Sequence, residues 1–258
     1  MRHPSRMQRS SKPPTTDGPR HGIARVLSKA GLCSRTHAAA WVREGRVAVN
    51  DRVVRDPEHP VRPGVDRVAV DGRDIAAAQR LYLALNKPRG LVTTASDEKG
   101  RDTVYACFAD AGLPWLAPVG RLDQASEGLL LMSNDPAWAA AITDPGTGPD
   151  KTYHVQVDAI PDPALLARLV QGVVDDGEPL AAKSATLLRS GSRNAWLEIV
   201  LDEGRNRQIR RLLAAHGLGV LRLVRTAVGA VALGELPKGT WRALTDAEVS
   251  ILASASKD

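Results

Sequence analysis

The chain has 258 residues, 43% of them hydrophobic, which is enough for one large domain or for a medium and a small domain with buried cores. Aromatic residues are scarce, with a single Phe, so the core must consist mostly of Val, Leu, Ile and Ala. The formal net charge of +6 favours an anionic partner, most often a nucleic acid, although an ordinary basic protein would carry the same charge.

The N-terminus and the two cysteines indicate the setting in which the chain works. Residues 1–20 contain five basic residues, four prolines and no apolar segment, which predicts a disordered basic tail and not a secretory signal. Cys33 and Cys107 have neither metal-ligand spacing nor the pattern of a disulfide framework, so we expect no metal site and a reduced, cytoplasmic environment. No apolar run approaches the roughly 20 residues of a membrane helix.

The first ordered region, residues 21–76, has the pattern of two short helices and a β-hairpin. The segment "HGIARVLSKAGL" predicts a helix with one apolar face that stops at Gly31. Ser34 can cap a second helix, which ends at Gly45. The alternating valines that follow are interrupted at Asn50-Asp51, which predicts short strands and a hairpin. Basic residues are dense in this region: Arg25, Lys29, Arg35, Arg43, Arg46 and Arg52.

This region resembles the small ribosomal-protein S-four-like RNA-binding module, also called the alpha-L motif. The resemblance runs through "ARVLSKAGLCSR", "VREGRVAVNDRVV" and "DRVAVDG". It implies binding to structured RNA through the two-helix face. The RNA-binding residues would then be Arg25, Lys29, Arg35, Arg43 and Arg46. The alternative is a generic pair of basic helices with no RNA partner.

After a joint at "RDIAAAQR", residues 80–252 have a different pattern. Strand signals dominate, in "LYLALNK", "TYHVQVD", "SATLLR" and "AWLEIVLDEG". In the last segment Leu197, Ile199 and Leu201 alternate with more polar positions, which is typical of a half-buried strand. Helices are expected in "DPAWAAAITD", "DPALLARLVQGV" and "RNRQIRRLLAAHG". Because the helices interrupt the strands irregularly, we predict an α+β fold on a mixed, largely antiparallel sheet.

The segment "GRLDQASEGLLLMSND" is a candidate for chemistry. Asp123 follows Arg121 by two residues and precedes a polar turn and the apolar run Leu129–Met132. Asp123 is therefore expected on a loop held by a buried strand, with Arg121 keeping it ionised. Glu127 is a second carboxylate nearby, but it lies in the turn and we expect it to be solvated.

Two further segments add reactive side chains. In "KTYHVQV", Lys151 and Tyr153 are two apart on a strand and point to the same face, where the tyrosine ring can stack. In "EGRNRQIRRLLAAHG", a helix would bury its apolar positions and gather Arg207, Arg210 and Arg211 on another face. Such a cluster needs carboxylates or phosphates opposite, unless it is an ordinary solvated helix face.

Together these segments resemble the RNA pseudouridine synthases. "NKPRGLVTTASDEKGRDTV", "GRLDQASEGLLLMSND", "KTYHV" and the long segment from "EGRNRQIRR" to "WRALTDAE" follow one another behind the S-four-like module. This order is similar to that of the bacterial enzymes that isomerise uridines of small- and large-subunit ribosomal RNA. The resemblance extends over nearly everything from His21 to Glu248.

The resemblance implies roles for individual residues. Asp123 matches the essential aspartate, Tyr153 the tyrosine that stacks on the target base, and Arg210 the basic residue that pairs with the aspartate. Arg121 matches the arginine that helps to hold the site open or fills the space of the flipped base. We also expect substrate contacts from Lys151, Arg207 and Arg211.

The reaction breaks the uridine C1′–N1 bond, turns the base and rejoins it through C5. It involves no redox change and no activated water, so the resemblance implies neither a cofactor nor a metal. Asp123 can act as a nucleophile on the sugar or as a base that removes a sugar proton. The apolar "GLLLM" segment is expected to exclude water from the site.

Two other functions compete with this interpretation. One is a catalytically silent, ribosomal-RNA-binding assembly factor, although such a factor has no need of Asp123, Tyr153 and Arg210 together. A nucleoside hydrolase or glycosidase would need a carboxylate pair or metal ligands that the sequence does not offer. We therefore expect an enzyme that acts on ribosomal RNA or on ribosome assembly intermediates as a monomer, with 23S RNA favoured over 16S RNA.

Overall fold

The computed structural model describes residues 19–75, 79–95 and 97–254, and the chain divides into two compact units. Unit 1 comprises the chain up to Leu27 and Arg35–Ile75, and unit 2 comprises Ser28–Ser34 and the chain from Ala76 onward. Only Pro19 and Arg20 of the predicted basic tail are described, and residues 1–18 lie outside the described part. Within the described residues Cys33 is buried, Cys107 is half-buried, and the two form no disulfide.

The N-terminal elements are those that the sequence predicts. Helix α1 (Ile23–Lys29) ends before Gly31, which has φ +77°, and α2 (Arg35–Arg43) begins directly after Ser34. Asn50 and Asp51 both have positive φ, as the tight turn of a two-residue hairpin requires. The small strands are β1 (His21–Gly22), β2 (Val47–Val49), β3 (Arg52–Val54), β4 (Pro60–Val61), β5 (Val68–Val70) and β6 (Arg73–Asp74). Four of them form the sheet β3-β2-β5-β6.

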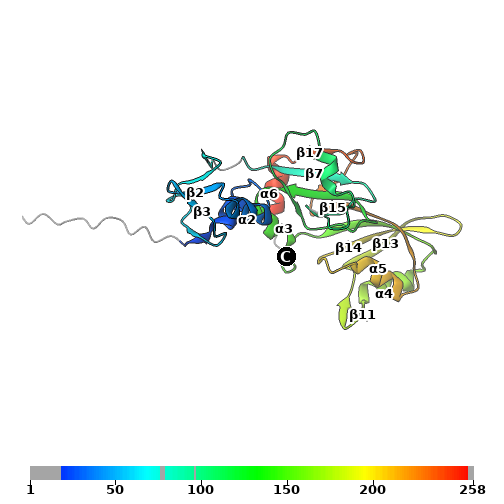
Figure 1. Ribbon diagram of the computed structural model, residues 1–258. Coiled ribbons are helices and arrows are strands. Elements are labelled where there is room, and N and C mark those ends of the chain that lie inside the picture. Colours follow the sequence, from blue (N-terminus) through cyan, green and yellow to red (C-terminus); the bar gives the residue numbers. More distant parts are fainter. Residues whose placement is uncertain (1–18, 76–78, 96, 255–258) are drawn as a thin grey trace, which may run out of the picture. The chain divides into compact units, whose positions relative to one another are not determined.

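In the described part of unit 2, a nine-stranded sheet carries the fold (Figure 1). Its main path is β13-β14-β10-β15-β9-β7-β17, with β8 beside β9 and β16 beside β15. The strands are β7 (Tyr82–Lys87), β8 (Ala117–Val119), β9 (Glu127–Ser133), β10 (Lys151–Val157), β13 (Ser184–Ser190), β14 (Ala195–Leu201), β15 (Val220–Val228), β16 (Val231–Ala232) and β17 (Trp241–Ala243). Among these pairs, β15 with β9 is parallel and the others are antiparallel, which confirms the predicted mixed, largely antiparallel sheet.

Two helices of unit 2 begin at side-chain caps. Asp135 and Asp162 are the N-caps of α3 (Pro136–Thr143) and α4 (Pro163–Gln171), and each is followed by a proline at the first helical position. The remaining elements are α5 (Gln208–Ala215), α6 (Asp246–Ser254), the 3-10 helix Val104–Phe108 and the hairpin β11 (Val173–Asp175) and β12 (Glu178–Leu180). Neither α6 nor the 3-10 helix was predicted from the sequence. Among the described helices, none has the length and apolarity to cross a membrane.

Two hydrophobic cores lie on opposite faces of this sheet. Alternate residues of β9 belong to different cores: Leu130 and Met132 to one, Leu129 and Leu131 to the other. Helices α4 and α5 cover the first face at β13, β14 and β10, and α3 and α6 lie side by side against the second (Figure 1). The strand β9 is thus buried throughout, and it fixes the loop that precedes it.

Candidate active site

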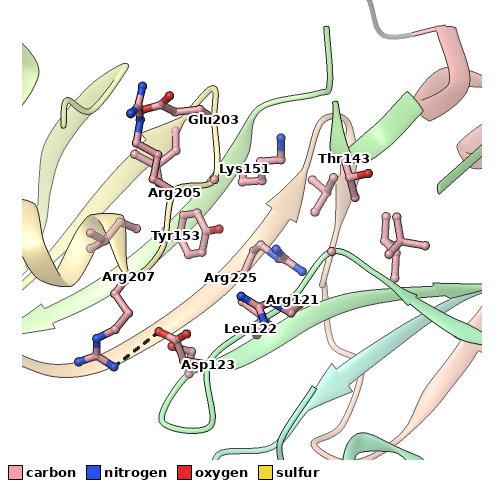
Figure 2. A pocket seen from close by; sticks show the side chains of 18 of the residues that line it. Arg121, Leu122, Asp123, Thr143, Lys151, Tyr153, Glu203, Arg205, Arg207 and Arg225 are labelled. Carbon is pink, nitrogen blue, oxygen red and sulfur yellow. Dashed lines mark hydrogen bonds and ion pairs between the residues drawn. The ribbon is translucent and has the colours of Figure 1, made fainter. Parts of the chain in front are cut away.

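A cavity of about 430 Å³ opens where β9 and β15 diverge, and Asp123 lies at its edge (Figure 2). Asp123 belongs to the loop between β8 and β9, and its side chain is 36% exposed. The basic residues in the lining are Arg121, Lys151, Arg205, Arg207 and Arg225, and the carboxylates are Asp123 and Glu203. The volume is in the range of small-molecule sites, and the lining carries more positive than negative charge.

The Asp123 loop is held by its backbone. Five successive carbonyl groups, those of residues 122–126, each accept a hydrogen bond. The donors are Thr93 Oγ1 to Leu122 at 2.7 Å, Lys87 Nζ to Asp123 at 3.2 Å and to Ser126 at 2.8 Å, Gly90 N to Gln124 at 2.8 Å, and Arg210 Nη2 to Ala125 at 3.2 Å. Lys87, Gly90 and Thr93 all come from the "NKPRGLVTT" segment, so that segment positions the loop for chemistry.

Lys87 is the central donor of this arrangement. Its side chain is 0% exposed, and its ammonium donates to the carbonyls of Pro88, Asp123 and Ser126. Burial lowers the pKa of Lys87 to about 8, and the nearby Asp123 acts in the opposite direction. The ammonium therefore uses all three of its donors, two of them on carbonyls of the Asp123 loop, at the cost of burying a charge.

The cation that pairs with Asp123 is Arg207, whereas the sequence predicted Arg210. The ion pair at Asp123 is with Arg207, at 3.9 Å between Nη1 and Oδ2 (Figure 2), whereas Arg210 donates to the Ala125 carbonyl. Burial, reinforced by the neighbouring charge of Arg207, lowers the pKa of Arg210. Arg207 has φ 50° and ψ 30°, and α5 begins only at Gln208. The two arginines therefore do not share a helix face, because Arg207 lies in front of the helix.

Tyr153 and Lys151 both line the cavity from β10. Tyr153 is 8% exposed and is paired across the sheet with Arg225 of β15. Figure 2 shows its ring between Arg205 and Arg225. A nearly buried ring in the wall of a charged cavity offers a flat apolar surface to a base.

Two of the remaining predicted substrate contacts have different outcomes. Arg121 lines the cavity and is exposed, as a substrate-contacting side chain would be. Arg211 does not line it, because its guanidinium is bound to Asp175 at 2.6 Å and to Glu178 at 2.5 Å in the β11–β12 hairpin. The helix periodicity that grouped Arg211 with its neighbours could not reveal this hairpin.

Glu127 is not a solvated turn residue. It is 3% exposed in β9 and forms ion pairs with Arg222 at 2.5 Å and with Lys238 at 2.6 Å. Burial by itself would raise the pKa of this carboxyl, but the hydrogen bonds from Arg222 and Lys238 outweigh burial and hold the pKa below its usual value. Glu127 is therefore a structural carboxylate, and the described cavity lining does not include it.

The predicted water-excluding wall is composed differently. Of the run Leu129–Met132, only Leu131 lines the cavity, and the apolar wall includes Ile142, Leu223 and Val228 from other elements. Arg225, Arg205 and Glu203 also line the cavity, although no role was predicted for them. One feature of the sequence could have identified Arg225. It follows Leu223 by two residues, so an arginine occupies a position that the alternation of the strand predicts to be buried.

All five predicted RNA-binding residues of the N-terminal region are exposed: Arg25, Lys29, Arg35, Arg43 and Arg46. Two of them already have carboxylate partners. Arg35 lies 3.3 Å from Glu58, and Arg46 forms two hydrogen bonds with Asp71 and also lies over the Trp41 ring. Arg25 and Lys29, one turn apart on α1, have no side-chain partner within the described residues, and the same is true of Arg43.

Unit 2 holds a carboxylate on a rigid loop and a nearly buried tyrosine in a cationic cavity. The N-terminal region that precedes it in the sequence carries exposed basic residues. Together these features define an enzyme that works on RNA. The model of the RNA pseudouridylate synthases matches residues 81–215, and that of the S4 domain matches residues 22–66. The chain belongs to the RNA pseudouridine synthase family and carries an N-terminal S4 domain.

Known relatives support this membership. A ribosomal large subunit pseudouridine synthase B of Bacillus subtilis (strain 168) is 36% identical over 89% of this chain and 94% of its own length. An uncharacterised RNA pseudouridine synthase of Aquifex aeolicus (strain VF5) is 37% identical over 90% of this chain and 94% of its own. A crystal structure of a pseudouridylate synthase, 29% identical, superimposes with a TM-score of 0.62 over 91% of this chain and 100% of that one.

Proposed function

We propose that this enzyme isomerises one specific uridine of ribosomal RNA, in the large-subunit (23S) RNA, with Asp123 as its single catalytic carboxylate. The observation that carries the proposal is the five-carbonyl clamp that fixes Asp123 at the edge of a cavity whose opposite wall holds Tyr153. The name of the Bacillus subtilis relative supports the large subunit as the source of the target.

The residues of the cavity divide the work of the reaction. The target base must leave the stack to enter, which costs a few kcal/mol, and stacking on Tyr153 offsets part of that cost. Asp123 acts on the ribose, either at C1′ as a nucleophile or on a sugar hydrogen as a base, and the glycosidic bond to N1 breaks. The base then turns, C5 bonds to C1′, and the C5 hydrogen leaves as a proton.

The surroundings of Asp123 suit this chemistry. Arg207 keeps a positive charge beside the carboxylate at 3.9 Å. Arg210 fixes the same loop by its hydrogen bond to the Ala125 carbonyl, two residues after Asp123. The apolar wall limits water, which would otherwise trap a detached base and leave an abasic site. We further propose Arg121 and Lys151 as substrate contacts, since both line the cavity.

The two parts of the chain have separate tasks in this proposal. Residues 21–76 bind structured RNA through Arg25, Lys29, Arg35, Arg43 and Arg46, and residues 80–252 carry the reaction. Ribosomal RNA or an assembly intermediate is the partner, and the cytoplasm is the compartment. We propose a monomer, because the S4 domain provides RNA binding within the same chain.

The test uses ribosomal RNA transcripts that carry tritium at uridine C5. Isomerisation replaces that hydrogen, so tritium must appear in water. We expect release by the wild type and none by Asp123→Asn, which keeps the shape of the side chain and removes its charge. Asp176→Asn removes one charge from an exposed hairpin turn and serves as the matched control, with wild-type release expected.

The outcomes separate the parts of the proposal. Release from 23S transcripts or from immature large-subunit particles supports it, and mapping the modified base identifies the target. Release from 16S RNA alone would overturn the large-subunit assignment. Full release by Asp123→Asn would refute the role of the carboxylate, and no release from any RNA or particle would indicate a protein that only binds.

A further inference from the structure

Arg225 is a charged side chain that the fold buries, and no carboxylate of the described residues pairs with it. It lies on β15 and is 6% exposed. Its Nε donates to the Leu129 carbonyl at 2.7 Å, and within residues 19–75, 79–95 and 97–254 neither terminal nitrogen has a hydrogen bond or an ion pair. Arginine is almost never buried unless it is paired, because an isolated charge is costly to remove from water.

The position of Arg225 is fixed by the catalytic strand. Its backbone pairs in parallel with Gly128 of β9, five residues after Asp123, and approaches so closely that a Cβ at Gly128 would collide with the Arg225 carbonyl. On its other side, Arg225 pairs with Tyr153 of β10. The backbone of Arg225 is therefore held between the two strands that carry the proposed chemistry.

The free end of this side chain faces the cavity. Arg225 lines the cavity, and Figure 2 shows its guanidinium next to Arg121, at the end of the side chain farther from Tyr153. Other cations of the lining have carboxylate partners: Arg205 binds Glu203 at 2.8 Å, and Arg207 lies 3.9 Å from Asp123. Among the described residues, the two terminal nitrogens of Arg225 thus keep four unused N–H donors for a molecule that enters the cavity.

The chemistry of an RNA substrate identifies the group that these donors fit. The uracil base is neutral, and the anionic groups of RNA are its phosphates. A guanidinium binds phosphate oxygens with two parallel hydrogen bonds, which are about twice as strong as neutral ones. A phosphate would also neutralise the excess of positive charge in the lining.

We propose that Arg225 forms a phosphate subsite inside the cavity and binds the non-bridging oxygens of a phosphodiester next to the target uridine. The inference rests on the proposed function and adds an anchor to it. During isomerisation the base is detached from the sugar and only the backbone still holds the ribose in place. A phosphate held by Arg225 keeps C1′ in register with Asp123, while Tyr153 retains the free base.

The experiment replaces one charged phosphate by a neutral group. An RNA fragment centred on the uridine mapped by the tritium assay carries a methylphosphonate at the linkage 5′ or 3′ of that uridine, with a 2′-O-methyl group beside the linkage for stability. The reference RNA has the same 2′-O-methyl group and an ordinary phosphodiester. For each protein, the ratio of the two dissociation constants is measured.

For the wild type, we expect one of the two methylphosphonates to weaken binding about tenfold to a hundredfold, the range of a hydrogen bond to a charged group. Arg225→Met should bind that RNA and its reference equally, within about twofold. Arg225→Lys keeps the charge without the planar fork, and part of the discrimination should return. Arg168→Met removes an exposed arginine of α4 outside the cavity lining and should discriminate like the wild type.

Because each ratio compares two RNAs on one protein, a general loss of affinity or stability in a variant cancels. The inference is overturned if the wild type binds both methylphosphonate RNAs as well as their references, or if Arg225→Met retains the full discrimination. Failure of the proposed function is a different result, since the wild type would then release no tritium.

Discussion

Replacing Lys87 with Met tests whether the carbonyl clamp positions Asp123. The substitution removes the donor to the carbonyl groups of Pro88, Asp123 and Ser126. The Asp123 carbonyl keeps one hydrogen bond, which it accepts from the Ser126 amide at 3.0 Å. The carbonyls of Pro88 and Ser126 are left without a donor within the described residues, at about 1–3 kcal/mol each. Against this, the variant no longer buries an ammonium whose pKa falls from 10.5 to about 8, a relief of roughly 3 kcal/mol.

The two effects largely cancel in stability but not in activity. We expect Lys87→Met to lose roughly 0–3 kcal/mol of unfolding free energy. Because the loop that carries Asp123 loses its central donor, the rate of tritium release should fall about tenfold, since small misplacements of a catalytic group are costly.

The pH dependence gives the sharper readout. The folded state releases the Lys87 proton near pH 8 and the unfolded state near pH 10.5. Between these values the unfolded state binds more protons, so this group makes the fold more stable as pH rises. A neutral amine has only two N–H donors for three carbonyls, so wild-type activity should decline above pH 8 while stability does not.

Single-turnover tritium release from pH 6 to 10, together with urea unfolding at each pH, measures both quantities. Lys87→Met should lack the alkaline step near pH 8, and Lys99→Met, at an exposed position, should retain it. If Lys87→Met keeps the wild-type rate and the same alkaline step, the positioning role of Lys87 is wrong.

Three further substitutions test the framework of the site. Gly128→Ala places a Cβ against the backbone of Arg225 at φ +101°, and urea unfolding should show a loss of about 2–4 kcal/mol; a loss below about 0.5 kcal/mol would contradict the close approach. Glu127→Gln should cost about 1–3 kcal/mol at pH 7, since its two cations are partly exposed. Because the pKa of this carboxyl is lowered by folding, the difference from wild type should shrink as pH falls below its usual value, and a constant difference would count against the ion pairs. Arg211→Met should reduce stability by less than about 2 kcal/mol and leave RNA binding within about threefold, whereas a much larger loss in a binding assay would restore Arg211 as a substrate contact.

The elements that the sequence predicts well are those whose burial has a simple period. In β14, Leu197, Ile199 and Leu201 are buried and their neighbours are half-buried, because one face of the strand packs under helices. The starts of α3 and α4 were also predictable from the sequence, because an aspartate caps each helix and the proline after it occupies the first helical position. Asp123 and Tyr153 were found because their segments combine polar residues with such buried strands.

The site residues that were misassigned depend on contacts between distant segments. Glu127 follows a polar turn in the sequence, yet the parallel pairing of β9 with β15 buries it beside Arg222. Arg211 has helical spacing from Arg207, but its partners come from a hairpin about 35 residues earlier in the chain. Pattern and period carry no information about such long-range pairings.

Arg207 illustrates how the chemistry of a site overrides local preference. Its left-handed backbone costs a residue other than glycine about 1 kcal/mol, and it provides no side-chain cap for α5. What it does provide is the guanidinium beside Asp123, in an ion pair so exposed that it contributes little to stability. Arg207→Gly should therefore leave the unfolding free energy unchanged or raise it by up to about 1 kcal/mol, while tritium release falls at least fivefold. Arg207→Lys keeps both the strain and the charge and should retain most of the activity. If Arg207→Gly were fully active, or clearly less stable than the wild type, the strain at residue 207 would need a structural explanation in place of a catalytic one.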